Sequence, residues 1–238
     1  MTDLTVVIPC YNEAASLPTL FAAMARSISD DVAMDVIVVD NGSTDDTPRV
    51  LAQLVAAHGF VSSVRVPANQ GYGHGIVTGL RRAAGRVVGW THADLQTDPA
   101  DVVSGYRAFR EPLLAGRTVV KGRRIGRPLV DRLCTAGMSA VASLALSGRF
   151  ADINAQPKLF PRELLERMQN APDDFSLDLY LLWLARRNGY ALAEFPVRFR
   201  PREHGEAKGG GSLRLKWRLT RRTLSYTLAL RRRVAGGK

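Results

Sequence analysis

The chain has 238 residues, of which 46% are apolar and 23% charged, a composition typical of a folded globular domain and unlike that of collagen, coiled coils or disordered chains. Its charge is unevenly placed: 33 Lys and Arg stand against 22 Asp and Glu, yet residues 208–238 hold ten of the basic residues and none of the acidic ones. A nearly neutral body with one basic segment argues against nucleic acid as a partner and favours a segment that docks on something anionic.

The cysteines and the first residues indicate the compartment. Cys10 and Cys134 lie far apart in the sequence and match no metal-ligand spacing, as is typical of free thiols in a reducing environment. The chain opens directly on a strand-like run, with no basic or long apolar leader. Its longest uncharged stretch, Leu133 to Gly148, is too short and too polar to span a bilayer. We therefore expect a cytoplasmic protein.

Strand and helix patterns alternate through the first half of the chain. The apolar, β-branched runs Leu4–Pro9 and Met34–Asp40 are typical of buried parallel strands, and apolar residues at helical spacing lie between them from Leu17 to Ile28. Further strands are predicted at 61–66, 86–90 and 118–121, and further helices at 44–58, 75–84 and 98–115. This alternation predicts an α/β fold with a mostly parallel central sheet flanked by helices.

After residue 126 the pattern becomes richer in helices. Helices are predicted at 129–146 and 177–188, followed by a strand at 191–199. Residues 200–212 show no apolar pattern and contain three consecutive glycines, so we expect a mobile loop there. The last segment, 212–233, predicts a basic amphipathic helix. Its apolar stripe consists of Leu213, Trp217, Leu224 and Leu228.

Polar segments follow the first four predicted strands, where ligands bind in open parallel sheets. These segments are Cys10–Glu13, Asp40–Asp46, Asn69–Gly75 and Thr91–Pro99. Neither the dinucleotide pattern G-x-G-x-x-G nor the P-loop pattern G-x-x-x-x-G-K-[ST] occurs. Asp94 and Gln96 alternate across one residue, so in an extended loop both oxygens can face one Mg²⁺ or Mn²⁺ that bridges phosphates. The sequence therefore favours a nucleotide held by side chains and a metal ion.

These segments also carry a family resemblance. In order, VVIPCYNEAASLP, IVVDNGSTDDTP, NQGYGHG and ADLQTDP resemble the nucleotide-sugar-binding half of family 2 glycosyltransferases with the GT-A fold. Later segments, KGRR, Asp152, Phe175 with Asp178, and RPREHGEAK, are similar to dolichyl-phosphate mannose synthases and polyprenyl-phosphate glycosyltransferases. The resemblance covers residues 4 to about 210. It implies a nucleotide-sugar-binding half at 1–126, an acceptor half with a lid loop at 127–211, and a separate basic helix at 212–238.

The resemblance also assigns roles to residues. It implies that Pro9, Tyr11, Glu13, Asn69, Gly71, Ala93 and Asp94 bind the nucleotide sugar, and that Asp40 hydrogen-bonds the nucleobase. Mg²⁺ or Mn²⁺ would be held by Asp94 and Gln96, with His92, which replaces the first acid of the family's D-A-D-x-Q loop, as a candidate third ligand. Arg124, Arg202 and Lys208 would neutralise charge on the diphosphate or on an acceptor phosphate.

The expected reaction is metal-dependent transfer of a sugar with inversion. A phosphate acceptor needs no general base, whereas a hydroxyl acceptor needs a carboxylate, for which Asp178 is the first candidate, with Asp152 and Asp174 behind it. The favoured acceptor is a polyprenyl phosphate or another membrane-proximal molecule. The alternatives are a hydroxyl of a small natural product or sugar nucleotide, and a catalytically silent binding module, suggested by His92.

Two expectations concern the end of the chain. For the basic helix, contact with an anionic membrane surface through 212–233 is favoured over plain packing on the domain, and nucleic-acid binding is the weakest alternative. This would make the protein peripheral on the inner membrane face. The loop RPREHGEAKGGGS is expected to be a lid that closes Arg202 and Lys208 over the phosphates, with a flexible linker as the alternative.

Overall fold

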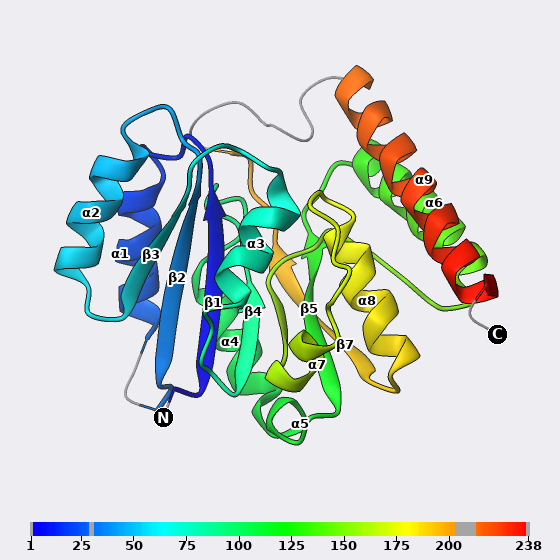
Figure 1. Ribbon diagram of the computed structural model, residues 1–238, viewed down its shortest axis with the longest axis horizontal. Helices are drawn as coiled ribbons and strands as arrows, with labels where there is room; N and C mark the ends of the chain where they lie inside the picture. The colour runs from blue at the N-terminus through cyan, green and yellow to red at the C-terminus, as the bar shows by residue number, and fades with distance from the viewer. Residues whose placement is uncertain (1, 29–30, 203–212, 237–238) are drawn as a thin grey trace.

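The computed structural model describes residues 2–28, 31–202 and 213–236, with side chains from 221 to 232 in the last segment (Figure 1). Its centre is a seven-stranded sheet with the order β3-β2-β1-β4-β6-β5-β7. The strands are β1 (Leu4–Cys10), β2 (Met34–Asn41), β3 (Val61–Val66), β4 (Val87–Trp90), β5 (Thr118–Ile125), β6 (Lys158–Pro161) and β7 (Ala191–Arg198). β1 and β2 are buried along almost their whole length, as expected for apolar strands covered on both faces.

Strand β6 is the exception to the parallel arrangement. It runs antiparallel to β4 on one side and to β5 on the other, whereas β1, β2, β3 and β4 pair in parallel, as do β5 and β7. Lys158, its first residue, therefore lies opposite Trp90 at the end of β4. The mostly parallel sheet is confirmed, but the sequence analysis missed β6, because a run of four residues that begins with lysine carries no strand pattern.

Helices cover both faces of the sheet. They are α1 (Leu17–Ser27), α2 (Thr47–Ala57), α3 (Tyr72–Leu80), α4 (Ala100–Ala108), α5 (Arg110–Leu114), α6 (Leu129–Ala145), α7 (Arg162–Glu166), α8 (Leu177–Arg187) and α9 (Leu213–Gly236). Apolar residues of α1, α2, α4 and α5 share one buried cluster, and those of α3, α7 and α8 share another on the opposite face. The helix predicted at 98–115 is interrupted at Phe109, whose φ of −125° ends α4 before α5 begins.

Helices α6 and α9 pack against each other beyond the edge of this sandwich, at the right of Figure 1. From α9, Thr223, Thr227 and Leu230 are buried, whereas Leu228 of the predicted apolar stripe is 53% exposed. The outer side of α6 is unusually apolar for a surface: Leu129, Val130, Leu133, Val141 and Leu144 are all exposed. In the part of the chain that the structure describes, no helix has the length and apolarity needed to cross a membrane.

Candidate active site

A cavity of about 480 Å³ opens at the carboxyl ends of the central strands and reaches α6 and α9. Most residues predicted for the site line it: Pro9, Tyr11, Glu13, Asn69, His92, Ala93, Asp94, Gln96, Arg124, Asp178 and Arg202. Further lining residues include Asn41, Tyr72, Arg127, Asp131, Gln156, Phe175, Phe199 and Thr223. Segments from both halves of the chain thus meet around one space. Lys208 and most of the predicted lid loop lie outside the described residues.

The turn after β1 is held by the turn after β2. The Glu13 amide donates to the Thr47 hydroxyl at 2.9 Å, and the Ser16 hydroxyl donates to Glu13 Oε2 at 3.2 Å. The other carboxylate oxygen of Glu13 forms an ion pair with Arg202, which approaches from the far end of the chain. Glu13 and Arg202, predicted for different parts of the site, are therefore direct partners in this state.

Asn41, the last residue of β2, lines the cavity, whereas Asp40 does not. Asp40 is 2% exposed, and its Oδ1 accepts the Ser43 amide at 2.9 Å. Its Oδ2 lies 3.6 Å from Arg65 Nε and has no hydrogen-bond partner among the residues described. Asn41 Nδ2 donates to the Gly71 carbonyl at 2.8 Å, which ties β2 to the turn after β3.

Gly71 belongs to that turn but lies outside the cavity lining. Its φ is +109°, and a Cβ there would come within 2.3 Å of the Asp173 carbonyl oxygen. Both facts require glycine. Its amide donates to Asn69 Oδ1 at 2.9 Å, so the backbone of Gly71 fixes a side chain that does line the cavity. The role of Gly71 in the structure is therefore to support the site.

The loop after β4 brings the predicted metal ligands together. Leu95 has a φ of +59° and separates Asp94 from Gln96. The backbone amide of Gln96 donates to Asp94 Oδ1 at 3.2 Å. Asp94 Oδ2 lies 3.9 Å from Arg202 Nη1. Within residues 2–28, 31–202 and 213–236, no group of three or more His, Cys, Asp or Glu is arranged to hold a metal ion. A hard cation at Asp94 fits only if the amide oxygen of Gln96 and phosphate oxygens of a ligand complete its coordination, as is usual for Mg²⁺.

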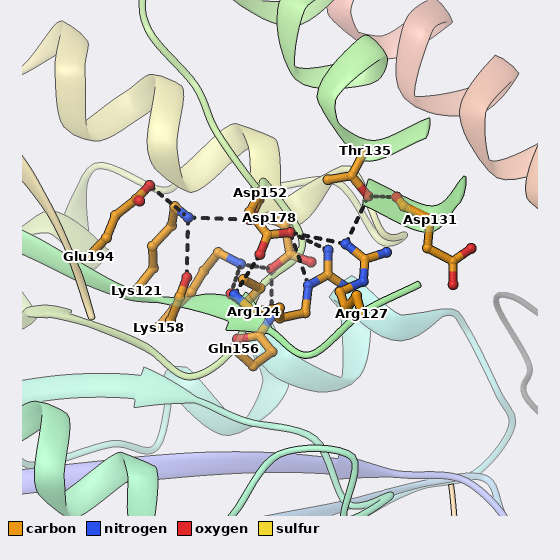
Figure 2. Close-up of polar contacts among 12 residues, drawn as sticks. Lys121, Arg124, Arg127, Asp131, Thr135, Asp152, Gln156, Lys158, Asp178 and Glu194 are labelled. Carbon is orange, nitrogen blue, oxygen red and sulfur yellow. Dashed lines mark hydrogen bonds and ion pairs between the residues drawn. The ribbon is translucent and has the colours of Figure 1, made fainter. Parts of the chain in front are cut away.

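Asp178 lies at the start of α8, on the wall of the cavity, and is 1% exposed. Its Oδ1 accepts from Lys158 Nζ at 2.6 Å and from Gln156 Nε2 at 2.9 Å (Figure 2). Its Oδ2 is buried without a hydrogen-bond partner in the described chain. Gln156 also donates to the Tyr72 hydroxyl at 3.1 Å, and the Tyr72 ring stacks on Phe175 with ring centroids 4.6 Å apart.

Burial shifts the pKa values of two ionisable groups next to Asp178, Lys158 and Tyr72. It lowers the pKa of the Lys158 ammonium to about 8, although the attraction of Asp178 opposes the shift. It raises the pKa of the Tyr72 hydroxyl well above its usual range, and the negative charge of Asp178 adds to that shift. The sequence analysis missed Lys158 and Gln156, because they belong to the unpredicted strand β6 and the residues just before it.

A second polar cluster lies beside the first and consists of Arg124, Arg127 and Asp152 (Figure 2). The amide and Nε of Arg124 donate to Asp152 at 2.8 and 2.9 Å, and Arg127 Nη1 lies 3.6 Å from the same carboxylate. Both guanidinium groups stack over Phe199, at 5.4 and 5.7 Å from its ring centroid. Burial would raise the pKa of Asp152, but its bonds to Arg124 outweigh burial and lower it. The cluster therefore carries two cations and one carboxylate.

The other two carboxylates considered as bases are occupied. Asp152 is held between Arg124 and Arg127, and Asp174 accepts the Ser176 amide at 2.7 Å and pairs with Arg222. Neither is among the residues that line the cavity. Of the three candidates, Asp178 alone lines the cavity, and its buried Oδ2 has no hydrogen-bond partner among the described residues.

Comparison with known proteins agrees with this geometry. The model of the family described as glycosyl transferase family 2 matches residues 5–137. An uncharacterized glycosyltransferase of Mycobacterium tuberculosis is 31% identical over 218 residues, which cover 89% of this chain and 91% of that protein. The glycosyltransferase AglD of Haloferax volcanii is 26% identical over 236 residues, covering 92% of this chain and 38% of that longer protein.

Among solved structures, glucosyl-3-phosphoglycerate synthase from Mycobacterium tuberculosis is similar in fold. Its complex with Mn²⁺, UDP-glucose and phosphoglyceric acid has a TM-score of 0.74 at 24% identity, covering 97% of this chain and 79% of that one. Its complex with UDP has a TM-score of 0.73 at 25% identity, covering 97% and 80%. The fold and the enzyme class expected from the motifs are confirmed: the chain belongs to glycosyl transferase family 2 and is a glycosyltransferase with the GT-A fold.

Proposed function

We propose that the chain transfers a sugar, with inversion, from a nucleotide-diphosphate donor to an acceptor phosphate, carried by a polyprenyl chain or presented near a membrane. The observation that carries this proposal is the single cavity lined both by the Asp94 loop and by the cationic side chains Arg124 and Arg127. The Asp94 loop suits the donor diphosphate. The arginines suit a second anion, because guanidinium groups bind phosphate oxygens in pairs.

The donor would lie along the ends of β1 to β4. Pro9, Tyr11 and Glu13 would contact the base and ribose, with Asn41 and Asn69 beside them. Asp40 would accept a hydrogen bond from the nucleobase, and its buried Oδ2, which lies 3.6 Å from Arg65 but accepts no hydrogen bond from a described residue, supports this role. The likeness to a synthase solved with UDP and UDP-glucose favours a uridine nucleotide as the first donor to test.

Mg²⁺ or Mn²⁺ would be held by Asp94 and Gln96 together with the donor diphosphate, with His92 at the same wall of the cavity. Crystals of the similar synthase that contain UDP with Mn²⁺ or Mg²⁺ support this choice of metal. When bound, such an ion neutralises the charge that grows on the departing diphosphate. Arg202, 3.9 Å from Asp94, would add a second positive charge to the same leaving group.

An acceptor phosphate is already an anion, so it can attack the sugar carbon without a base. A second candidate is a hydroxyl acceptor on a small water-soluble molecule, and one observation favours it: Asp178 lines the cavity and its Oδ2 accepts no hydrogen bond from a described residue. A hydroxyl nucleophile needs such a group to take its proton as the bond to carbon forms. The two candidates differ in the acceptor and not in the donor chemistry.

The proposal of a membrane-proximal acceptor rests on α6 and α9. Asp131, Thr135 and Met138 of α6 line the cavity, while the outer side of the same helix exposes leucines and valines. The neighbouring α9 exposes Arg221, Arg222, Arg231 and Arg232. An apolar face next to basic side chains is the pattern of a surface that lies on anionic lipid. We infer that this surface holds the enzyme on the inner face of a membrane.

The test is a transfer assay with purified protein and Mn²⁺. UDP- and GDP-sugars are offered with either a polyprenyl phosphate in anionic vesicles or water-soluble phosphates and sugar alcohols, and the products are identified by mass spectrometry and by NMR of the anomeric proton. Transfer to the polyprenyl phosphate supports the leading proposal. Transfer only to a hydroxyl supports the second candidate, and retention of configuration would contradict both.

A further inference from the structure

Two charged side chains beneath the cavity are buried more completely than stability alone explains. Lys158 is 0% exposed and Asp178 1%, and their Nζ and Oδ1 atoms are 2.6 Å apart. Removing two charges from water costs several kcal/mol for each ion, and their attraction often fails to recover that cost. A buried ion pair therefore calls for an explanation other than stability.

The arrangement of hydrogen bonds treats the two oxygens of Asp178 differently. Oδ1 accepts from both Lys158 and Gln156, whereas Oδ2 has no partner within the described residues and belongs to a side chain that lines the cavity. Lys158 Nζ donates a second hydrogen bond, to the Ala155 carbonyl at 3.0 Å, and lies 5.7 Å from the centroid of the Trp90 ring. The ammonium group therefore has a fixed position, and so does the oxygen that it binds.

Gln156 adds a second restraint from another direction. Its amide nitrogen donates to Asp178 and also to the Tyr72 hydroxyl at 3.1 Å, and Tyr72 is itself stacked on Phe175. Side chains from β6 and from the segment before it thus bind one carboxylate of α8, and a side chain from α3 accepts a hydrogen bond from Gln156. Rotation of the carboxylate would break both bonds to Oδ1. The restraints leave Oδ2 as the carboxylate oxygen that accepts no hydrogen bond from the described residues.

We propose that Lys158 and Gln156 are positioning residues that hold the carboxylate of Asp178 in one orientation and aim its Oδ2 at a hydroxyl group of the bound substrates. This inference rests on the proposed function, since it requires a sugar donor and an acceptor in the cavity. It holds for either acceptor. With a hydroxyl acceptor Oδ2 takes the proton, and with a phosphate acceptor Oδ2 orients a hydroxyl of the transferred sugar.

The surroundings of Lys158 make the restraint dependent on pH. The charged groups that act on its ammonium are Asp178 on α8 and Lys121 and Arg124 on β5. Burial is the largest influence, and it lowers the pKa of Lys158 to about 8. Lys158 is therefore a cation below pH 8 and becomes a neutral amine as the pH rises through that value. The fixed hydrogen bond between two ions weakens over the same range, so turnover should fall there.

The first experiment measures this coupling without any activity. The lysines of the chain are Lys121, Lys158, Lys208, Lys216 and Lys238, few enough for their side-chain carbons to be followed by NMR in labelled protein. Lys158 should titrate near pH 8, below the ordinary lysine value of 10.5. Asp178→Asn should lower that midpoint, because the attracting charge is lost, and Lys121→Met should raise it. A Lys158 midpoint near 10 that Asp178→Asn leaves unmoved would overturn the proposal.

The second experiment measures turnover of the wild-type enzyme with the donor and acceptor that the transfer assay identifies. Lys158→Met should lower kcat by about 100-fold, the usual contribution of a placed acid or base, and leave the KM for donor within a few-fold. Lys158→Arg should restore part of kcat and shift the alkaline limb to higher pH, because guanidinium stays protonated.

Lys121→Met is the matched control, because Lys121 is also buried but pairs with Glu194 at 3.0 Å and lies outside the cavity lining. It should lose stability and keep kcat at neutral pH, while the alkaline limb of its pH profile moves upward together with the midpoint of Lys158. Equal losses of kcat in Lys158→Met, Lys158→Arg and Lys121→Met, at equal folded fractions, would assign the pair to stability and refute a positioning role.

The inference and the proposed function can fail separately. If the wild-type enzyme transfers no sugar from any donor, the proposed function is wrong, while the titration still reports whether Lys158 and Asp178 are coupled. If the wild type transfers sugar and Asp178→Asn does so equally well, the positioning role is wrong and the proposed function stands.

Discussion

The part of the cavity proposed for the donor (the donor half, at the ends of β1 to β4) and the part proposed for the acceptor (the acceptor half, around Asp178 and Arg124) are built in different ways. Around the donor half, functional side chains follow the strands directly in sequence. Asp94 and Asn69 are held by the backbone amides of Gln96 and Gly71, although Glu13 also pairs with the distant Arg202. Around the acceptor half, each functional side chain is held by another side chain far away in sequence, as Asp178 is by Lys158 and Arg124 by Asp152. The comparison teaches that a substitution in the donor half should act locally, whereas one in the acceptor half should also disturb its partner.

The largest expected effect tests the local character of the donor half. Asp94→Asn removes the carboxylate proposed to hold the metal and should reduce metal-dependent turnover on the order of 1,000-fold, the size of several kcal/mol of lost transition-state stabilisation. Steady-state rates across a Mn²⁺ titration measure it. Asp98→Asn is the control, because Asp98 accepts the backbone amide of Ala100 at 3.0 Å at the start of α4. Turnover of this variant should depend on the metal as in the wild type. Near-normal turnover in folded Asp94→Asn would show that the loop holds no catalytic metal.

A smaller effect is expected where the acceptor half is shared between side chains. Arg127→Ala should raise the KM for a phosphate acceptor by about 10- to 100-fold, the value of one charged hydrogen bond, and leave UDP affinity unchanged. Initial rates at varied acceptor concentration, with calorimetry for UDP, separate the two. Asp152→Asn should produce a similar loss through the two arginines that it holds, and the double variant should lose less than the sum of the single losses. Exposed Arg149→Ala serves as the control. Additive losses would mean that Asp152 and Arg127 act independently.

Asp40 tests whether the donor half extends beyond the cavity lining. If Asp40 accepts a hydrogen bond from the nucleobase, Asp40→Ala should weaken the binding of UDP by roughly tenfold, the value of a hydrogen bond to a charged group. Calorimetry with UDP and Mn²⁺ measures the change, and Asp46→Ala, at an exposed position, provides the comparison. Unchanged UDP affinity in a folded Asp40→Ala protein would assign Asp40 to the turn that it already stabilises through Ser43.

The smallest effect concerns the outer side of α6. Leu144 is 86% exposed, and Leu144→Glu should reduce binding to anionic vesicles about fivefold by removing an apolar contact worth roughly 1 kcal/mol at a partly inserted surface. Vesicle sedimentation at low and high salt measures it. The substitution Leu228→Glu, at an exposed position of α9, tests whether this helix contributes equally to vesicle binding. Vesicle binding of wild type no stronger than that of a Leu133→Glu, Leu144→Glu double variant would contradict membrane contact through α6.

What the sequence could predict follows the same division. The sheet, the order of its first strands and nearly all donor-side residues were predictable, because strand ends and polar turns are local patterns. The presence of Asn41 in the cavity lining, where Asp40 was expected, was not predictable, since a shift of one residue at a strand end decides which side chain faces the cavity. Lys158, Gln156 and Arg127 were not, since only tertiary contacts show that a lysine in a four-residue strand is buried beside a carboxylate. The exposure of the apolar side of α6 was not predictable either, because its sequence pattern is that of an ordinary buried helix.

Strand β6 has a consequence for how enzymes of this type can be recombined. In sequence β6 follows residue 126, in the part proposed for the acceptor. In space it lies between β4 and β5, two strands of residues 1–126, with Lys158 opposite Trp90 and Phe160 opposite Val88. A chimera that joins residues 1–126 of this chain to the remainder of a relative would receive a foreign strand in the middle of its sheet. Exchange of acceptor preference between relatives should therefore succeed when β6 and its partner α8 are transplanted together, and fail when the junction separates them.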